Sequence, residues 1–517
     1  MCGIGAIFGK SETLKEDLKK SLSKIEHRGN ELHESVVLDN CALGANRLAI
    51  VDRLSGKQPL TNEDKTIYAI QNGEIFNYKE LKKDLKSKGH SFKTECDTEV
   101  LTHLWEEYGK EMINKIDSEM FAIVIYDKNK DLFFIARDPI GIKPLYYAYD
   151  SKKRLFIASE IKQLSQFDNI KEVREFPPGN YFFKGKFTKY FKIPDKANKI
   201  SKEKIKKDLK SIIEKAVKKR VQTDLPIGVF LSGGVDSSFV MELATRYHKD
   251  VTAIILGTKS SPDLINAVKL CKEKNWKYKV VEPDNKYEEE EIKEIVYYAE
   301  SYEPNIVRHS FANDMVSKKA AELGLKIILV GEGSDELFGG YNEFAELPKE
   351  KINLGCKMLL ESMSNGNLMR VDKMAMKNTI EIRCPLFDTA LIKYAMKISG
   401  KFKVVHKENE VVTKAIFREV ASDYLPKDIA YRYKAPFANG AGMNIGVNFL
   451  LSDGAIGEIA NKKISDKIFK EIKKSFPKYK FSTKEEIYYF LFYRNFNYIK
   501  FKDGEKRLIV KDNLTTI

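Results

Sequence analysis

Long hydrophobic runs are missing from this 517-residue chain. None approaches the roughly 18 apolar residues of a membrane-spanning helix, and the runs at 121–126 and 326–330 have the length of buried strands. The first residues lack the apolar core of a signal peptide and soon reach lysine. We therefore expect neither a membrane segment nor secretion.

Cysteine is scarce, with six residues scattered along the chain. No CxxC pair occurs, and no cluster of cysteine and histidine has the spacing of a zinc site. These gaps argue against a disulfide scaffold and indicate reduced thiols in a cytoplasmic protein. Five of the six are expected to be small core residues, namely Cys41, Cys96, Cys271, Cys356 and Cys384.

Low-complexity segments and internal repeats are also absent. The apolar fraction of 43% and aromatic fraction of 11% are typical of a folded protein, and the length allows about two to four domains. Lys and Arg number 89 against 74 Asp and Glu, a net charge of +15. These charges are mixed in amphipathic patterns such as 201–220, which favours solvated helix faces over an RNA-binding surface. We expect no nucleic-acid partner.

The chain changes character near residue 195. Before it, short strand patterns alternate with helix patterns, which predicts a layered α+β domain with mainly antiparallel sheets. A linker is expected at 193–199. After it, strands alternate with helices, which predicts an α/β domain with a doubly wound parallel sheet and ligands at the carboxyl ends of its strands. A mostly helical part follows from about Leu347, and a helix is expected over Ser310–Leu323.

A glycine-rich turn follows the expected strand 227–231. The segment Leu231–Ser238 reads LSGGVDSS, so two glycines precede a helix start rich in hydroxyl groups. Main-chain N–H groups at such a turn can hold phosphate oxygens, helped by the helix N-terminus. The alternative is an ordinary strand–helix turn. The string lacks the P-loop lysine and resembles the pyrophosphate-binding loop of ATP pyrophosphatases.

A second strand end carries two carboxylates amid glycines. Glu332 and Asp335 lie three residues apart in Gly331–Tyr341, after the expected strand 326–330. Acidic residues at this edge suit metal binding or general-base chemistry. The alternative is a loop whose acids cap the next helix.

The third signal is at the start of the chain. Removal of Met1 would make Cys2 the first residue, and its α-amine could then take the thiol proton. The alternative is an incidental buried cysteine. Asn72-Gly73 could form an ordinary hairpin turn, or it could aim the Asn72 amide and the Gly73 N–H at one point as an oxyanion hole.

Many motifs in order along nearly the whole chain resemble the B-type glutamine-dependent asparagine synthetases. The resemblance implies an αββα-layered class II, N-terminal-nucleophile glutamine amidotransferase domain over 1–195 and a synthetase domain of the ATP pyrophosphatase type over 200–517, with a homodimer as the expected assembly. The matching segments are Met1–Ile4, His27–Gly29, Arg47–Asp52, Asn72–Glu74, Asp97, Gly141–Tyr147, Pro177–Gly179, Ser232–Ser238, Ser261–Asp263, Gly331–Tyr341, Arg370–Lys373 and Glu381–Asp388.

The resemblance implies that Cys2 attacks the side-chain amide of glutamine, forms a glutamyl thioester and releases ammonia, which travels through the interior. Arg47 would pair with the substrate carboxylate, and Glu74 and Asp97 would hold its α-amine. The rest of the expected glutamine site is the main chain of Leu48, Ala49, Ile50 and Val51 with Asn72 and Gly73.

At the second site the resemblance implies that ATP converts aspartate to β-aspartyl-AMP, which ammonia then attacks. Glu332 would act as the base, Lys434 would steady phosphate charge, and Asp236 and Asp335 would hold Mg²⁺. The expected nucleotide site comprises Leu231, Ser232, Gly233, Gly234, Asp236, Ser237, Leu256, Val330 and Gly331.

The sequence departs from the family pattern at several positions. Arg28-Gly29 is followed by Asn30-Glu31 where Pro-Asp is usual, Val330 replaces a hydroxyl residue, and Asn439 replaces an acid. The most consequential change is in 303–308, where Asn305 and Ile306 replace threonines before Arg308, the expected acceptor-binding residue. An acceptor other than aspartate therefore stays open: a sugar, a peptide or a cyclising small molecule. A non-catalytic sensor is disfavoured by Cys2, Glu332 and Lys434.

Overall fold

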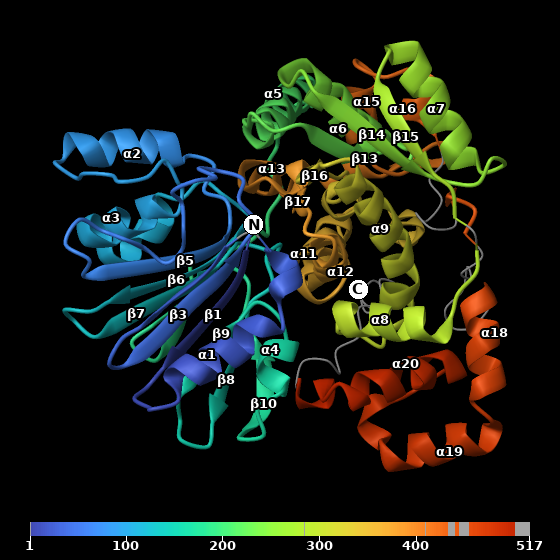
Figure 1. Ribbon diagram of the computed structural model, residues 1–517. Coiled ribbons are helices and arrows are strands. Elements are labelled where there is room, and N and C mark those ends of the chain that lie inside the picture. The colour runs from blue at the N-terminus through green and yellow to red at the C-terminus, as the bar shows by residue number, and fades with distance from the viewer. Residues whose placement is uncertain are drawn as a thin grey trace.

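The computed structural model describes residues 2–30, 32–283, 285–408, 410–432, 440–443 and 454–501 (Figure 1). Across these ranges, no helix combines the length and apolar character needed to cross a membrane. All six cysteines are buried and free of disulfide bonds. Burial of Cys41, Cys96, Cys271, Cys356 and Cys384 agrees with their expected place in the core.

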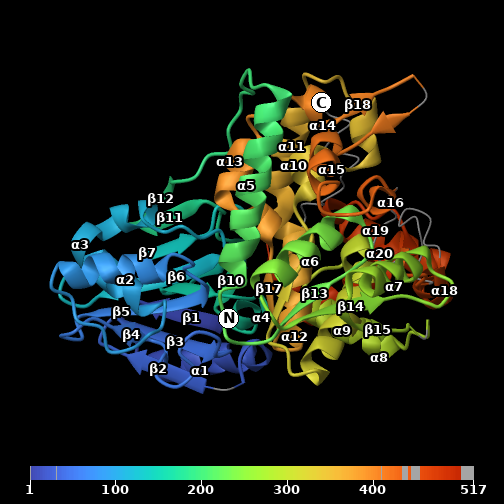
Figure 2. The same ribbon diagram turned by 90° about the horizontal axis from the view of Figure 1, so that it is seen from above.

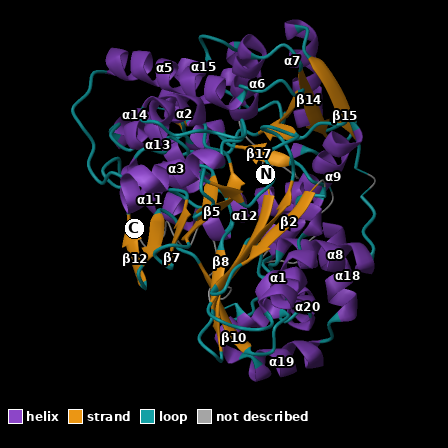
Figure 3. Ribbon diagram, turned by 60° about the vertical axis from the view of Figure 1, so that its left-hand side comes forward, coloured by secondary structure: helices purple, strands orange, loops and turns teal. Residues whose placement is uncertain are grey.

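Two six-stranded antiparallel sheets form the core of the first part of the chain (Figures 1 and 3). Between them lies an apolar cluster that includes Ile4, Ala6 and Phe8 from one sheet and Ile70 and Val124 from the other. In spatial order, the first sheet comprises β10 (Ile170–Glu175), β8 (Tyr146–Asp150), β9 (Leu155–Ala158), β1 (Cys2–Phe8), β3 (Cys41–Arg47) and β2 (Leu32–Val37).

Helices cover the outer faces of both sheets, so the expected αββα layering is confirmed (Figure 1). Helices α1 (Leu14–Ser23) and α4 (Lys162–Ser165) lie on the first sheet, and α2 (Tyr78–Ser87) and α3 (Glu99–Tyr108) lie on the second. The second sheet comprises β12 (Lys186–Lys189), β11 (Asn180–Phe183), β7 (Leu132–Arg137), β6 (Phe121–Asp127), β5 (Ile67–Gly73) and β4 (Leu60–Thr61).

A five-stranded parallel sheet forms the core of the second part, as predicted (Figure 2). In this sheet β13 lies beside β16. Strands β14 and β15 follow outward from β13, and β17 lies on the other side of β16, so the strand order reverses between β13 and β16. The carboxyl ends of β13 and β16 are therefore where a ligand is expected. The strands are β15 (Lys277–Val281), β14 (Val251–Leu256), β13 (Ile227–Phe230), β16 (Ile327–Leu329) and β17 (Glu381–Arg383).

Helices surround this sheet and extend beyond it, and a small hairpin joins β18 (Val405–His406) to β19 (Val411–Val412). The helices are α5 (Lys202–Arg220), α6 (Val235–Tyr247), α7 (Pro262–Lys274), α8 (Glu289–Ala299), α9 (Pro304–Glu322), α10 (Ser334–Phe338), α11 (Ile352–Ser362), α12 (Asn367–Lys377), α13 (Thr389–Ala395), α14 (Gly400–Lys403), α15 (Ala415–Ala421), α16 (Lys427–Ala430), α18 (Gly454–Lys463), α19 (Asp466–Ser475) and α20 (Lys484–Asn495).

The structure corrects one helix boundary and excludes one alternative for Asn72-Gly73. Helix α9 begins at Pro304, six residues before the expected start at Ser310, because the Glu303 side chain accepts the Ile306 N–H and proline suits the first helical position. Arg308 therefore lies within a helix. Asn72 and Gly73 are not a hairpin turn; they end β5, where they pair with β6.

Candidate active sites

Cys2 begins β1 and pairs directly with Arg47 at the end of β3. Its side chain is buried, and Gln58 Nε2 lies 3.6 Å from its sulfur. Gln58 is itself held in place, because its Nε2 donates to Thr98 Oγ1 and its Oε1 accepts the Gln71 N–H. The sequence gave no signal for Gln58, since it is 56 residues from Cys2 and lies in an unremarkable segment.

Burial raises the pKa of the Cys2 thiol. The charged amino terminus and Arg47 act in the opposite direction and lower the pKa, as does a hydrogen bond from the main chain of Leu48. A thiol in such a place needs a base close by, which is the role that an α-amine on the same residue could fill.

The Asn72 side chain lies against the backbone of Cys2. Its amide can be oriented in two ways: its oxygen accepts the Cys2 N–H at 3.3 Å, or the reversed amide donates to the Cys2 carbonyl at 2.8 Å and accepts from Arg28 at 3.3 Å. The reversed orientation satisfies more groups. Gly73 beside it has φ +139°, and a Cβ there would lie 2.1 Å from the Met120 carbonyl oxygen, so only glycine fits.

Arg47 has one guanidinium nitrogen in use and one available. Its Nη2 donates to the carbonyl oxygens of Val51 and Asp52 at 2.6 and 2.8 Å. Its Nη1 is buried and has no hydrogen-bond partner. A buried, unsatisfied guanidinium nitrogen is costly, so a carboxylate ligand would relieve it.

Asp97 and Glu74 lie on the same side of this site. Asp97 Oδ2 accepts from Gln71 Nε2 at 2.7 Å and from the Ile75 N–H at 2.9 Å. Burial raises the pKa of both carboxyl groups, and for Glu74 the charges of Glu381 and Asp97 raise it further. Two neighbouring buried acids suit a positively charged ligand such as an α-ammonium group.

The second domain reaches into this site through Arg383 on β17. Arg383 Nη2 lies 3.5 Å from Glu74 Oε1, and its Nε donates to Glu381 Oε1 at 2.6 Å. The positive charge of Arg383 lowers the pKa of Glu74 and so opposes the effect of burial. Sequence reasoning assigned no role to this arginine, although its motif was recognised.

The glycine-rich turn after β13 is folded tightly around hydroxyl groups. Ser237 Oγ accepts the Ser232 N–H at 3.1 Å, and Gly234 begins α6 as its N-cap. Gly233 has φ +70°, and a Cβ on Gly331 would lie 2.7 Å from the Ser237 nitrogen. The loops that follow β13 and β16 are therefore in contact, as expected from two neighbouring parallel strands.

The remaining expected nucleotide-site residues lie along the same edge of the sheet. Leu231 and Val330 directly follow β13 and β16, and Leu256 ends β14. The Leu231 N–H donates to Ile254 and the Val330 N–H to Arg383, so both segments continue the sheet hydrogen bonding. All three side chains are buried and apolar, which is suitable for the face of a base or a sugar.

Asp236 and Asp335 both contact the ammonium group of Lys414. Lys414 Nζ lies 2.9 and 2.8 Å from the two oxygens of Asp236 and 2.9 Å from Asp335 Oδ1. The two carboxylates therefore converge on one cation, and their oxygens are donors that Mg²⁺ accepts. The carboxylates of Asp236 and Asp335 are therefore suitable ligands for Mg²⁺. Sequence reasoning missed Lys414, which is 178 residues from Asp236.

Glu332 lies in the turn between β16 and α10, partly exposed. Its charge acts on Arg370 of α12: burial lowers the pKa of Arg370, and Glu332 raises it. Arg432 donates to Asp263 at 2.6 Å and to the Gly233 carbonyl, so it holds the turn after β13. Lys434, the expected phosphate-steadying lysine, lies outside the described residues.

Arg308, the expected acceptor-binding residue, makes a bidentate ion pair. Its Nε and Nη2 donate to the two oxygens of Glu485 on α20 at 2.8 and 2.6 Å. Tyr489 donates to the same carboxylate at 2.7 Å. The fully buried Glu485 neutralises the positive charge that an anionic acceptor would meet.

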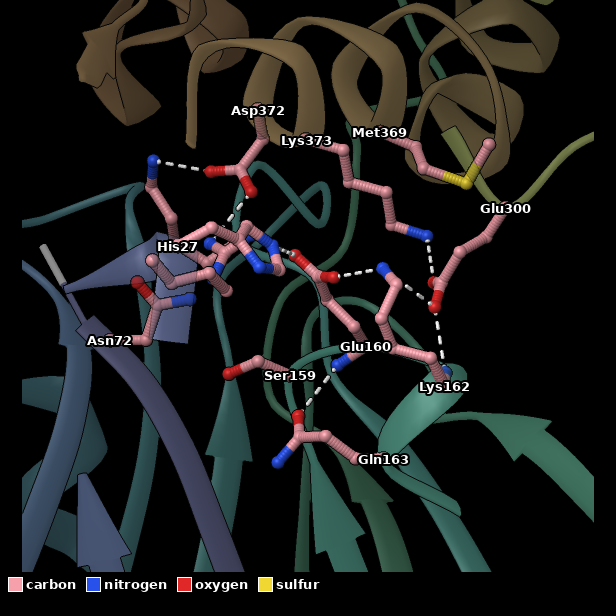
Figure 4. Close-up of polar contacts among 12 residues, drawn as sticks. His27, Asn72, Ser159, Glu160, Lys162, Gln163, Glu300, Met369, Asp372 and Lys373 are labelled. Atoms are coloured by element: carbon pink, nitrogen blue, oxygen red, sulfur yellow. Dashed lines mark hydrogen bonds and ion pairs between the residues drawn. The ribbon is translucent and has the colours of Figure 1, made fainter. Parts of the chain in front are cut away.

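Buried charges, among them Glu160 and Asp372, join the two domains (Figure 4). Arg28 donates to Glu160 and, across the domain boundary, to Asp372, in each case at 2.8 Å. Lys143 Nζ contacts the other oxygen of Asp372 at 3.0 Å. Arg28 Nε also lies 3.4 Å from the Cys2 carbonyl oxygen, so the interface directly contacts the residue expected to carry the nucleophile.

A second set of buried pairs continues this interface (Figure 4). Glu300 accepts the main-chain N–H groups of Ile161 and Lys162 at 2.9 and 2.7 Å and pairs with Lys373 of α12. The Lys162 ammonium also contacts Glu160. Both domains thus contribute charges that the other one neutralises.

Comparisons with known proteins agree with this two-site architecture. A glutamine amidotransferase domain matches residues 1–193, and an asparagine synthase domain matches 208–355 and 349–471. Asparagine synthetase [glutamine-hydrolyzing] 3 of Arabidopsis thaliana is 34% identical over 518 residues, covering 96% of this chain and 87% of the relative. Asparagine synthetase [glutamine-hydrolyzing] of Sandersonia aurantiaca is 33% identical and 96% of each chain is covered.

Among solved structures, the glutamine PRPP amidotransferase from B. subtilis covers 54% of this chain and 66% of its own, at 18% identity and a TM-score of 0.31, which adds nothing to the assignment. The two family matches define a glutamine amidotransferase domain joined to an asparagine synthase domain. This chain belongs to the family of glutamine-hydrolysing asparagine synthetases.

Proposed function

We propose that this protein makes asparagine from aspartate, ATP and glutamine, and releases AMP, pyrophosphate and glutamate. The observation that carries the proposal is the buried Arg47 Nη1 without a hydrogen-bond partner, on the strand paired with Cys2. It offers a carboxylate-binding group beside a nucleophile, as glutamine hydrolysis requires. Family membership supplies the second half of the reaction.

At the first site, Cys2 would be the amino-terminal residue after loss of Met1. Its thiolate would attack the amide carbon of glutamine while its own α-amine takes the thiol proton and passes it to the leaving ammonia. Water would then cleave the C–S bond of the glutamyl thioester, which releases glutamate and restores the thiol. Asn72 and the Gly73 N–H would stabilise the oxyanion. Arg47 would bind the substrate carboxylate, Glu74 and Asp97 would bind its α-ammonium group, and the main chain of Leu48–Val51 would line the pocket.

At the second site, the aspartate carboxylate would attack the α-phosphorus of ATP and expel pyrophosphate. The turn Ser232–Ser237 would hold phosphate oxygens at the N-terminus of α6. Asp236 and Asp335 would hold Mg²⁺, which supplies positive charge to the phosphates when bound. Glu332 would take a proton from ammonia as it attacks the acyl-adenylate, and Lys434 would steady the phosphate charge.

The direct test is product analysis. Purified protein incubated with ATP, glutamine and aspartate should yield asparagine, with AMP and pyrophosphate in equal amounts to it. Mass spectrometry of the same sample should show Cys2 as the first residue. ADP instead of AMP, or full activity in protein that keeps Met1, would contradict the proposed mechanism.

A related amidotransferase with another acceptor is the second candidate. It is favoured by the Arg308–Glu485 pair, which neutralises the expected acceptor-binding arginine, and by Asn305 and Ile306 in place of threonines. Vigorous glutaminase activity without asparagine would favour this candidate. A sugar, peptide or cyclising carboxylate that stimulates AMP release would then identify the acceptor class.

We further propose a cytoplasmic homodimer whose partners are its small-molecule substrates, with no nucleic acid and no membrane. The six free, buried cysteines support a reducing compartment. Light scattering would test the dimer, and RNA binding that falls steeply with added salt would contradict the absence of a nucleic-acid partner.

A further inference from the structure

Four metal-ligating side chains meet on the outer face of the first domain, away from both active sites. They are Glu63 in the turn between β4 and β5, His90 in the segment after α2, and His103 and Glu106 on α3. One ligand atom from each lies within 4.8 Å of all the others. Helices α2 and α3 lie together on the side of the molecule opposite the parallel sheet (Figure 1).

The separations that involve the two histidine nitrogens are close to those in a tetrahedral metal site. His90 Nδ1 lies 3.2 Å from His103 Nδ1, and Glu106 Oε2 lies 3.6 and 3.4 Å from the same two nitrogens. Glu63 Oε1 lies 3.7 Å from His90 Nδ1, and Glu63 Oε2 lies 3.4 Å from His103 Nδ1. Ligands about 2.0–2.2 Å from a tetrahedral Zn²⁺ are separated by about 3.3–3.6 Å.

Outer contacts hold His90, Glu63 and Glu106, whereas the outer Nε2 of His103 is buried without a hydrogen-bond partner among the described residues. His90 Nε2 lies 3.1 Å from Glu107 Oε1, so a proton on that nitrogen is stabilised and Nδ1 presents its lone pair. Glu63 Oε1 accepts the Ser91 N–H at 2.6 Å, and Glu106 Oε1 accepts from Asn62 at 2.8 Å. These are the supporting hydrogen bonds that fix metal ligands in place.

The charge of the cluster also suits a divalent cation. Two carboxylates and two neutral imidazoles would neutralise a charge of +2, and the two Nδ1 atoms, 3.2 Å apart, could both face one cation. Imidazole nitrogen favours zinc and its transition-metal neighbours over Mg²⁺ and Ca²⁺. His103 is fully buried, which shields one side of the site from water.

We propose that Glu63, His90, His103 and Glu106 form a structural Zn²⁺ site. The sequence did not predict it, because the four residues span 44 positions and include no cysteine. The metal would tie three segments together, and one of them leads through Cys96 and Asp97 into α3. The Zn²⁺ site would thus hold the loop that carries Asp97 in place. Metal binding can be measured without assaying the proposed reaction.

The test is metal binding by the full-length chain, purified without a polyhistidine tag and stripped with a chelator. After incubation with Zn²⁺ and gel filtration, the chain should retain about one equivalent of zinc. Co²⁺ should give the intense visible absorption of a tetrahedral complex. His90→Gln and the more exposed Glu106→Gln should each lower the affinity at least about tenfold.

His406→Gln is the matched control, because His406 is exposed on β18 and remote from the cluster. It should bind zinc like the unmodified chain. Circular dichroism would verify that every variant is folded. Failure of the unmodified chain to bind zinc, equal binding by all variants, or an octahedral Co²⁺ spectrum would overturn the proposal; the two rings would then share a proton instead.

Discussion

The two candidate active sites differ in how their charges are balanced before substrate arrives. At the first, Arg47 keeps a buried nitrogen without a partner. At the second, Asp236 and Asp335 already share the Lys414 ammonium. Under the proposed function, glutamine would add contacts to an unsatisfied site, whereas Mg²⁺ and ATP would have to compete with an existing ion pair. One chain would thus bind charged substrates in two different ways.

The largest expected effect separates the sites completely. Cys2→Ala should lower glutamine-dependent asparagine formation by about 10³-fold or more, because only the first site uses the thiolate. Synthesis from added ammonium salt should be nearly unchanged. Parallel assays with glutamine and with ammonium chloride measure both. Loss of both activities in folded protein would contradict the division into two sites.

Glu332→Gln should have the converse effect. Asparagine synthesis should fall about 10²–10⁴-fold, the usual contribution of a general base, while glutaminase activity is retained. Exchange of labelled pyrophosphate into ATP in the presence of aspartate should persist, because Glu332 would act only after adenylation. Glu350→Gln, at an exposed position, is the control. Full synthesis by Glu332→Gln would dismiss it as the base.

A smaller effect tests whether the second domain helps to build the first site. Arg383→Gln should raise the KM for glutamine about 10- to 100-fold, because Glu74 loses its cation and holds its proton more tightly. The KM for ammonia should change little. Arg53→Gln alters an exposed arginine as the control. Equal rises in both KM values would mean that Arg383 is merely structural.

The smallest effect concerns acid stability. Burial raises the pKa of Asp388, but Arg220 and Lys219 outweigh it and lower the pKa to about 2. An Asp side chain in the unfolded chain has a pKa of about 3.9. The stabilisation that Asp388 gains from Arg220 and Lys219 is therefore present above about pH 4 and is lost as the pH falls toward about 2. Asp388→Asn should lower Tm by about 2–4 °C at neutral pH, and the difference should narrow in acid. A constant difference would argue against the pair.

Local signals in the sequence were sufficient to predict the glycine-rich strand–helix turn and the parallel sheet. Ser232–Ser237 is one short string after a buried strand, so its conformation depends on neighbours in the chain. Strand β1 was missed, because every residue of Cys2–Phe8 is buried and no alternation of polar and apolar residues marks it. The equally buried run 121–126 was recognised because its apolar residues are uninterrupted, whereas Gly3 and Gly5 weaken the strand pattern of β1.

Long-range partners could not be predicted in the same way. Gln58, Lys414 and Arg383 each act on a residue that is 56 or more positions away, and each would pass for a surface residue on its own. Arg308 shows the converse: its motif position suggested an acceptor ligand, and Glu485, 177 residues later, engages it. Only the folded chain brings these charges together.

The shared ion pairs behind Cys2 limit how this protein can be divided or recombined. A glutaminase half produced alone would leave Lys143 without Asp372, and the other half would leave Asp372 without Arg28 and Lys143. Each uncompensated charge costs about 3–5 kcal/mol. Chimeras that graft either half onto a relative should therefore fold only when the residues of both domains that form these interdomain ion pairs are transferred together.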